Sequence, residues 1–146
     1  MRRRWHTFRR LNRQEWRLLA DAMVSLTVVW IGLRTIGYGR TRSILCRVSP
    51  SAGTGACPNC GHAIMKQATW SIAASASAIP MAITCLDRSL ALWWLLRRRN
   101  IDCDLRIGTA QTENGVAAHA WLERDGVVLN DSKDVTERFS TFSGLR

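Results

Sequence analysis

CLDRSLALWWLLRRRN, residues 85–100, is the stretch from which the architecture of this chain can be predicted. Its centre, residues 90–96, is apolar on every side of a helix, and such a helix is buried in a protein core. Asp87 lies in the first turn and three arginines lie in the last, which suits the two ends of the helix dipole. Asn100 can adopt the left-handed conformation that closes a helix. We therefore predict a buried central helix that begins at about Cys85.

Two further helices are expected before this one. Asn12 and Glu15 form a capping-box pattern, which predicts a helix over about 13–35. Apolar residues at steps of three and four give that helix one apolar face, which we interpret as packing on the core. The segment 38–62 is rich in Gly, Ser, Pro and Arg and is predicted to be a linker. A helix over about 63–77, ended by Pro80, should follow it.

The pattern changes to a period of two after the central helix. Cys103, Leu105 and Ile107 alternate with charged residues, which predicts a strand. Residues 116–123 and 127–130 should form two more strands, joined as a hairpin through Asp125-Gly126. Helices followed by a small antiparallel sheet indicate the α+β class. We expect residues 1–60 to form a basic N-terminal helical region with a linker, and residues 61–146 to form the core domain.

The composition of the chain indicates a globular domain and the redox compartment in which it works. The 146 residues carry a formal net charge of +10, and 47% of them are hydrophobic, which is typical of a globular domain. Five cysteines are an odd number without a regular framework, so a disulfide scaffold is not expected. A reducing, cytoplasmic setting fits this cysteine usage better.

The N-terminal region combines clustered arginines with an apolar stretch. Seven arginines lie within residues 2–17, and they could contact nucleic acid, anionic lipid or an acidic peptide, or form a solvated end of the chain. Residues 18–33 contain Asp21, are shorter than the roughly 20 apolar residues of a membrane span, and precede no cleavage motif. We interpret this stretch as a core helix that can touch a membrane surface, and we do not expect export.

Cys85 is the candidate nucleophile. The unpaired N–H groups at the start of a helix lower the pKa of a thiol, and a neighbouring imidazolium lowers it further. Cys85 opens the predicted central helix, so its side chain would lie at the mouth of a cleft. Backbone N–H groups at the same place could stabilise a developing oxyanion.

His119 is the candidate base, and its orienting partner depends on the hairpin. A two-residue turn pairs Arg124 with Val127 and directs Asp131 away from His119, so that Asn130 is the nearer candidate. A three-residue loop with a bulge at Gly126 instead places Asp131 opposite His119. We favour Asp131, because a carboxylate forms the stronger, charge-assisted hydrogen bond. The predicted catalytic residues are Cys85, His119 and Asp131.

The other cysteines have separate interpretations. Cys57-Pro58-Asn59-Cys60 resembles half of a zinc site, and Cys46 and His62 could complete it. A structural zinc site usually takes its four ligands from two such pairs, and no second CxxC exists, so we expect neither a metal nor a cofactor. Cys103 alternates with apolar strand residues and is expected in the core.

These motifs together resemble the leader peptidases of lasso peptide biosynthesis, which are transglutaminase-like cysteine peptidases. The resemblance covers about residues 80–131 and rests on four motifs: CLDRSLALWWLLRRR (85–99), LRIG (105–108), AHAWLE (118–123) and Gly126. It implies a papain/transglutaminase-like core and the roles of nucleophile, base and orienting acid for Cys85, His119 and Asp131. The chain departs from the family in having Asn100 where Gly usually ends the helix. No Gln or Asn lies shortly before Cys85, so the second oxyanion donor is unassigned.

The resemblance also implies partners. Such an enzyme removes the leader peptide from a ribosomally made precursor, and an ATP-dependent lasso cyclase then closes the core peptide. No segment resembling the leader-recognition domain is evident, so a separate leader-recognition protein is expected. An acyltransferase with the same three residues is the first alternative, since both reactions pass through a thioester. A basic, zinc-containing nucleic-acid-binding module is the second; it leaves the Cys-His-Asp arrangement unexplained, and we expect no nucleic-acid partner.

Overall fold

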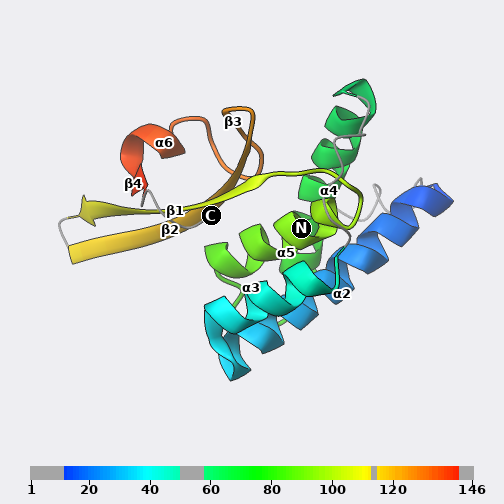
Figure 1. Ribbon diagram of the computed structural model, residues 1–146, viewed down its shortest axis with the longest axis horizontal. Helices are drawn as coiled ribbons and strands as arrows, with labels where there is room; N and C mark the ends of the chain where they lie inside the picture. The colour runs from blue at the N-terminus through cyan, green and yellow to red at the C-terminus, as the bar shows by residue number, and fades with distance from the viewer. Residues whose placement is uncertain (1–11, 50–57, 113–114, 142–146) are drawn as a thin grey trace.

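The computed structural model describes residues 12–49, 58–112 and 115–141, and its elements follow one another in the order helices, then sheet (Figure 1). The larger helices are α2 (Arg13–Thr35), α3 (Gly37–Arg47), α4 (Pro58–Ala78) and α5 (Cys85–Arg97). The strands are β1 (Asp104–Thr112), β2 (Gly115–Arg124), β3 (Val127–Val128) and β4 (Ser140–Thr141), with the short helix α6 (Val135–Arg138) between the last two. The strands form one antiparallel sheet in the order β3-β2-β1-β4. The predicted α+β class is confirmed.

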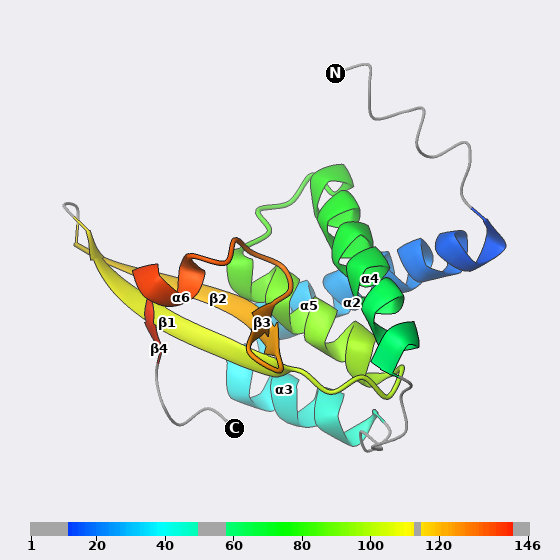
Figure 2. The same cartoon turned by 90° about the horizontal axis from the view of Figure 1, so that it is seen from above.

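Helix α5 is the centre of the molecule. All of residues 90–96 are at most 9% exposed, which confirms the buried helix expected from its uniformly apolar sequence. Figures 1 and 2 show α5 between the other large helices and the sheet, with α6 on the opposite side of the sheet. Leu105 of β1 and Leu122 of β2 belong to the same apolar cluster as α5. The sheet face that carries these two leucines therefore covers the helical core.

Helix α2 begins and ends as the sequence predicts. The Asn12 side chain accepts a hydrogen bond from the backbone N–H of Arg13, and the Asn12 backbone N–H donates to the Glu15 carboxylate at 2.6 Å. Its buried residues, Leu18, Ala22, Leu26 and Val29 among them, join the cluster that contains α5. The core thus includes side chains from both sides of residue 60, and a domain division at that point stays a prediction.

The predicted linker over residues 38–62 is wrong, because helix α3 occupies 37–47. Gly37 has φ of +77°, which interrupts the helical path after α2 and lets a second helix begin at once. A Cβ on Gly32 would lie 2.8 Å from the Thr41 methyl group, so the two helices approach closely there. Thr41 and Leu45 are the buried residues of α3. Helix α4 also begins earlier than expected, at Pro58.

Candidate active site

Cys85 is the first residue of α5, as the sequence predicts. The helix starts there because Thr84 caps it: the Thr84 Oγ1 accepts from the backbone N–H of Asp87, and the Thr84 N–H donates to the Asp87 carboxylate at 2.7 Å. The thiol is free and partly buried. It therefore lies at the positive end of a buried helix, where a thiolate is stabilised.

Asp87 has a second partner that the sequence did not reveal. Its side chain is 1% exposed and pairs with the guanidinium of Arg34, with 3.2 Å between Oδ1 of Asp87 and Nη1 of Arg34. The other guanidinium nitrogen of Arg34 donates to the carbonyl of Ala82 at 2.8 Å. Arg34 of α2 thus neutralises a buried carboxylate two residues after Cys85 and fixes the segment that leads into α5. The two residues are 53 positions apart, so no local pattern could have linked them.

Ser89 joins α5 to the edge of β2, one helical turn after Cys85. Its hydroxyl donates to the carbonyl of Ala120 at 2.9 Å. Leu122 accepts from the N–H of Leu129 on the β3 side, so the carbonyl of Ala120, two residues earlier, projects toward the same edge. The helix takes the place that a longer β3 would occupy. This contact joins the second turn of α5 to Ala120, the residue that follows His119 on β2.

Of the two hairpin registers left open by the sequence, the structure has the two-residue turn at Asp125-Gly126 and not the three-residue loop with a bulge. Arg124 pairs with Val127, and both Asp125 and Gly126 have positive φ, which is the primed turn that matches strand twist. Pairing between β2 and β3 stops after Val128. Because the chain then bends away from the ladder, strict alternation no longer fixes the directions of Asn130 and Asp131.

Both candidate residues have partners at this bend. Asp131 Oδ2 lies 2.5 Å from Nε2 of His119, so the contact expected for Asp131 is present although the register argument for it fails. Asn130 accepts from the backbone N–H of Leu122 at 2.8 Å and donates to Ser89 at 2.8 Å. Asn130 therefore links α5, β2 and the bend, while Asp131 contacts the imidazole.

Aromatic side chains surround the imidazole. Phe139 lies 5.1 Å from His119 between ring centroids, and the Trp121 ring, which is fully buried, lies 6.2 Å away and nearly parallel. A Cβ on Gly108, which pairs with His119, would lie 3.0 Å from both of these aromatic residues. The glycine at this position leaves the space that they fill. Phe139 was not expected at this site, because no strand or helix was predicted near it.

The carboxyl group of Asp131 is held in its charged form. Partial burial would raise its pKa, but the hydrogen bond with His119, the N–H of Ser132 and the charge of His119 together lower the pKa below its ordinary value. A carboxylate on Nε2 favours the tautomer in which this nitrogen carries the proton. Nδ1 is then the nitrogen with a free lone pair. Among the described residues, Cys85 forms no hydrogen bond, so its thiol is not joined to His119.

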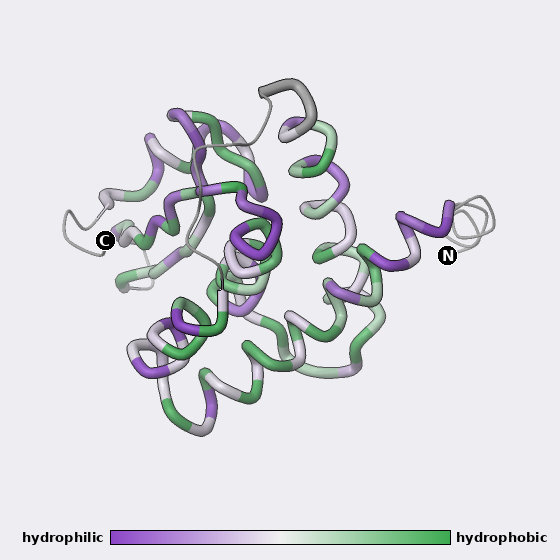
Figure 3. The backbone as a smooth tube through the Cα atoms, turned by 45° about the vertical axis from the view of Figure 1, so that its right-hand side comes forward, coloured by the Kyte–Doolittle hydropathy of each residue, from purple (hydrophilic) through white to green (hydrophobic). Residues whose placement is uncertain are grey.

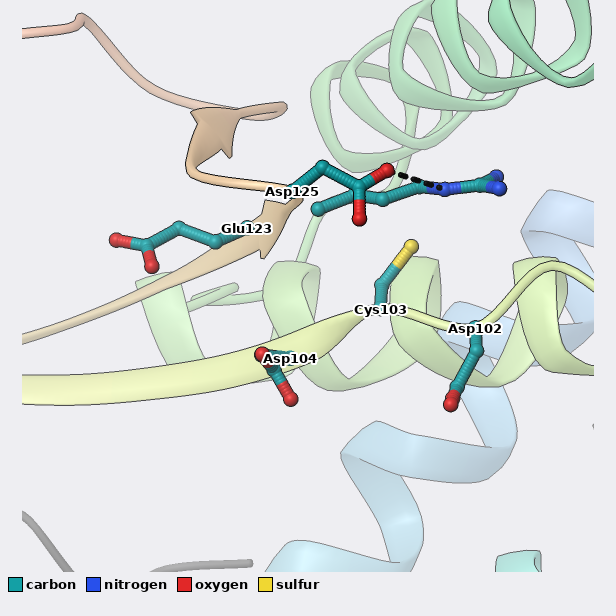
Figure 4. A pocket seen from close by; sticks show the side chains of 6 residues that line it. Asp102, Cys103, Asp104, Glu123 and Asp125 are labelled. Atoms are coloured by element: carbon teal, nitrogen blue, oxygen red, sulfur yellow. Dashed lines mark ion pairs between the residues drawn. The ribbon is translucent and has the colours of Figure 1, made fainter. Parts of the chain in front are cut away.

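Cys103 lies in a different environment from Cys85. It is 8% exposed and lines an open cavity of about 220 Å³ with Asp102, Asp104, Glu123, Arg124 and Asp125. Figure 4 shows its sulfur among these carboxylates, beside the ion pair between Arg124 and Asp125. Burial, opposed by Arg124 but aided by the nearby carboxylates, raises the pKa of Cys103 to about 12. The group is a protonated core thiol at neutral pH, as expected for a strand cysteine.

Two of the four residues considered as zinc ligands, Cys57 and Cys60, cannot be compared with the structure. The side chains of Cys57 and Cys60 lie outside the described residues. In residues 12–49, 58–112 and 115–141, no group of three or more His, Cys, Asp or Glu side chains is arranged to hold a metal ion.

A second cavity, of about 200 Å³, lies beside the hairpin. Met65 and other residues of α4 form one wall, and residues 127–129 form the other. Its lining is mostly apolar, with the polar ends of His62 and Lys66 at the rim. Leu129, one of its lining residues, is two positions before Asp131 in the sequence.

A family model described as the transglutaminase-like superfamily matches residues 23–143. This range includes most of the chain and all three predicted catalytic residues. The chain belongs to the transglutaminase-like superfamily, whose members are generally cysteine peptidases or acyltransferases. Neither the curated proteins nor the solved structures gave a significant match.

Proposed function

We propose that this protein is a cysteine peptidase that removes the leader from a lasso peptide precursor. The observation that carries the proposal is the His119–Asp131 hydrogen bond on the strand to which the first turns of the Cys85 helix are attached. The superfamily match supports chemistry at a thiol. The choice of a lasso precursor rests on the resemblance of residues 80–131 to that peptidase family.

The reaction uses the three residues in sequence. Nδ1 of His119 takes the proton of Cys85, and the thiolate attacks the carbonyl carbon at the leader–core junction. When the peptide C–N bond breaks, the imidazolium gives its proton to the leaving amine. His119 then takes a proton from a water molecule, whose oxygen attacks the thioester and releases the leader carboxylate and the Cys85 thiol. Asp131 keeps the tautomer and stabilises the imidazolium throughout.

Substrate and partners are part of the same proposal. The precursor leader peptide would be presented by a separate leader-recognition protein, and the freed core peptide would pass to an ATP-dependent lasso cyclase. The apolar cavity between α4 and residues 127–129 offers space for a substrate side chain. We place the enzyme in the cytoplasm, because its described cysteines are free.

A cleavage assay with the precursor and the recognition protein tests this function. We expect Cys85→Ala and His119→Ala to lose more than about 1,000-fold of the wild-type rate, because nucleophile and base act as a unit. Cys103→Ala is the matched control and should cleave at nearly the wild-type rate. Leader release by Cys85→Ala at the wild-type rate would refute the assignment.

Acyl transfer is the second candidate, because superfamily members also include acyltransferases. The acyl-enzyme is the same, and only the acceptor differs: an amine replaces water. Mass spectrometry of the products separates the two reactions. A leader product that gains the mass of an added amine, rather than of water, would identify a transferase.

A further inference from the structure

Helix α2 has two apolar faces, of which one is buried in the core and the other is largely exposed. Its buried residues, including Leu19, Leu26 and Val29, face the core. Its outer side carries Trp16, Met23, Val24, Val28 and Ile31, which are between 41% and 56% exposed. With 3.6 residues per turn, these five residues fall within about 140° of the helix surface. A helix on the outside of a soluble domain normally has a polar outer face, so this one indicates an interaction surface.

Because both faces of α2 are apolar, the helix has the length and apolar composition of a membrane span. Among the described residues it is the one helix long and apolar enough to cross a membrane by length and composition, and about a third of its most apolar window is buried. Figure 3 shows its start as hydrophilic and much of its remaining length as hydrophobic. Spanning would require Leu26 and Val29, which are fully buried, to leave the core. An orientation flat on a surface leaves the core intact.

The free charges around this face are positive, which suits binding to an anionic surface. Arg13 and Arg17 are exposed on the first two turns of α2, on the same side as the apolar residues. The two acids of α2 are both engaged: Glu15 accepts from the Asn12 N–H, and Asp21 pairs with Arg99 at 2.6 Å. Within the described part of α2, both carboxylates therefore have partners and neither is left free to repel an anion.

Helix α3 continues the pattern. It packs against α2, and Figure 1 shows the two helices together on the side of the molecule away from α6. Ile44 of α3 and Val48, which directly follows the helix, are 48% and 63% exposed, and Arg40 and Arg47 of α3 are exposed as well. Helix α3 contains no acidic residue.

We infer that the outer face of α2 and α3 binds the surface of an anionic membrane. The apolar side chains would enter the boundary between headgroups and acyl chains, and the arginines would contact lipid phosphates. The inference does not depend on the proposed peptidase activity. It places an enzyme with a folded catalytic core at a lipid surface without a membrane span.

Sedimentation with lipid vesicles tests this inference on the full chain. We expect binding to phosphatidylcholine vesicles that contain phosphatidylglycerol, and at least tenfold weaker binding to phosphatidylcholine alone. Binding should fall as sodium chloride is raised, because exposed charges are screened. Replacing Arg13 and Arg17 by Gln should weaken binding about fivefold for each arginine removed.

The apolar face is tested by the triple variant Val24→Gln, Val28→Gln and Ile31→Gln, which should bind at least tenfold more weakly. The matched control is Val116→Gln with Val127→Gln, two residues that are 71% and 52% exposed on the hairpins. Equal binding to both kinds of vesicle, or an equal loss in the control, would overturn the inference. So would a triple variant that keeps vesicle binding but loses self-association or binding to the leader-recognition protein. In that case the face is a protein interface.

Discussion

The hydrogen bond between Asp131 and His119 determines which imidazole nitrogen can act as a base. Because Nε2 faces the carboxylate, Nδ1 is left for the thiol. Cys85 has no hydrogen bond among the described residues, and catalytic hydrogen bonds often tighten only when substrate binds. The imidazole of His119 is therefore oriented by Asp131 before it forms a hydrogen bond with the Cys85 thiol.

Replacing Asp131 by Asn should slow leader cleavage about 10- to 100-fold. The change removes a charge-assisted hydrogen bond, which contributes about 1.5–3 kcal/mol, and leaves the shape of the site nearly unchanged. Single-turnover rates of the wild type and Asp131→Asn give the ratio. Asp134→Asn is the control, since Asp134 is exposed and pairs only with its neighbours. A larger effect of the control than of Asp131→Asn would contradict the assignment.

The lowered pKa of Asp131 predicts how stability depends on pH. A carboxyl group whose folded-state pKa is depressed stabilises the protein fully above its unfolded pKa of about 3.9, and this contribution is lost as the pH falls through the folded pKa. Urea unfolding should therefore show Asp131→Asn to be less stable than the wild type at pH 6. The difference should shrink at about pH 3. A difference that grows on acidification would have the wrong sign.

Arg34 should control the reactivity of Cys85 from another helix. Replacing Arg34 by Gln leaves the buried Asp87 carboxylate without its cation, and this negative charge disfavours a thiolate two residues away. The repulsion is worth about 2 kcal/mol at an effective dielectric of about 20, so we expect alkylation of Cys85 by iodoacetamide to slow about 30-fold. Mass spectrometry of the Cys85 peptide measures the rate.

The variant Asp87→Asn should change the rate of Cys85 alkylation in the opposite direction. It removes the negative charge and leaves Arg34 in place, so Cys85 should react faster than in the wild type, and the double variant should lie between the single ones. Arg40→Gln changes the net charge equally from an exposed position on α3 and should have little effect. Two single variants that both slow alkylation would indicate a purely structural role.

The junction between α5 and β2 depends on a single hydroxyl group. Ser89 is fully buried, donates to Ala120 and accepts from Asn130. We expect Ser89→Ala to lower the free energy of unfolding by about 1–3 kcal/mol, because two buried polar groups lose a partner. Ser77→Ala is the control: its hydroxyl is exposed on α4 and bonds only within its own helix. Urea unfolding compares the two variants, and equal losses would contradict this role of Ser89.

The sequence predicts those elements whose signals are local. The capping box of α2 and the uniformly apolar centre of α5 were both confirmed, because each rests on residues within a few positions of one another. Helix α3 was missed because its glycines and serine favour a loop in isolation, and burial of Thr41 and Leu45 against α2 overrides that preference. The Arg34–Asp87 pair is a tertiary contact and has no local signal.

The hairpin shows a partial success of a different kind. Asp131 was favoured for its charge and was expected to face His119 only in the bulged register, yet it contacts His119 although the hairpin has the two-residue turn. Alternation predicts side-chain direction only while strand pairing continues, and pairing ends at Val128. The role of Asn130 as a link to Ser89 depends on that bend and could not be predicted from the pattern.

The whole molecule should unfold as one unit, because side chains from α2, α4, α5 and the sheet belong to one cluster. Leu26 is fully buried in it, so Leu26→Ala should cost about 2–5 kcal/mol. Circular dichroism and tryptophan fluorescence should report one coincident unfolding transition in the wild type, and Leu26→Ala should shift both signals equally. Val24→Ala, at an exposed position on the same helix, should change stability by less than about 0.5 kcal/mol. Two separate transitions would instead support independent domains divided near residue 60.

The two-residue turn at Asp125-Gly126 has a consequence for how this protein can vary. Surface turns usually tolerate insertions and deletions. Here the turn sets the length of chain between His119 and Asp131, and β3 has only two paired residues with which to absorb a change. An insertion or deletion of one residue in the turn would break two contacts together: that of Asp131 with His119 and that of Asn130 with Ser89. Length variation among proteins that share this site should therefore be excluded from the hairpin, although it lies on the surface.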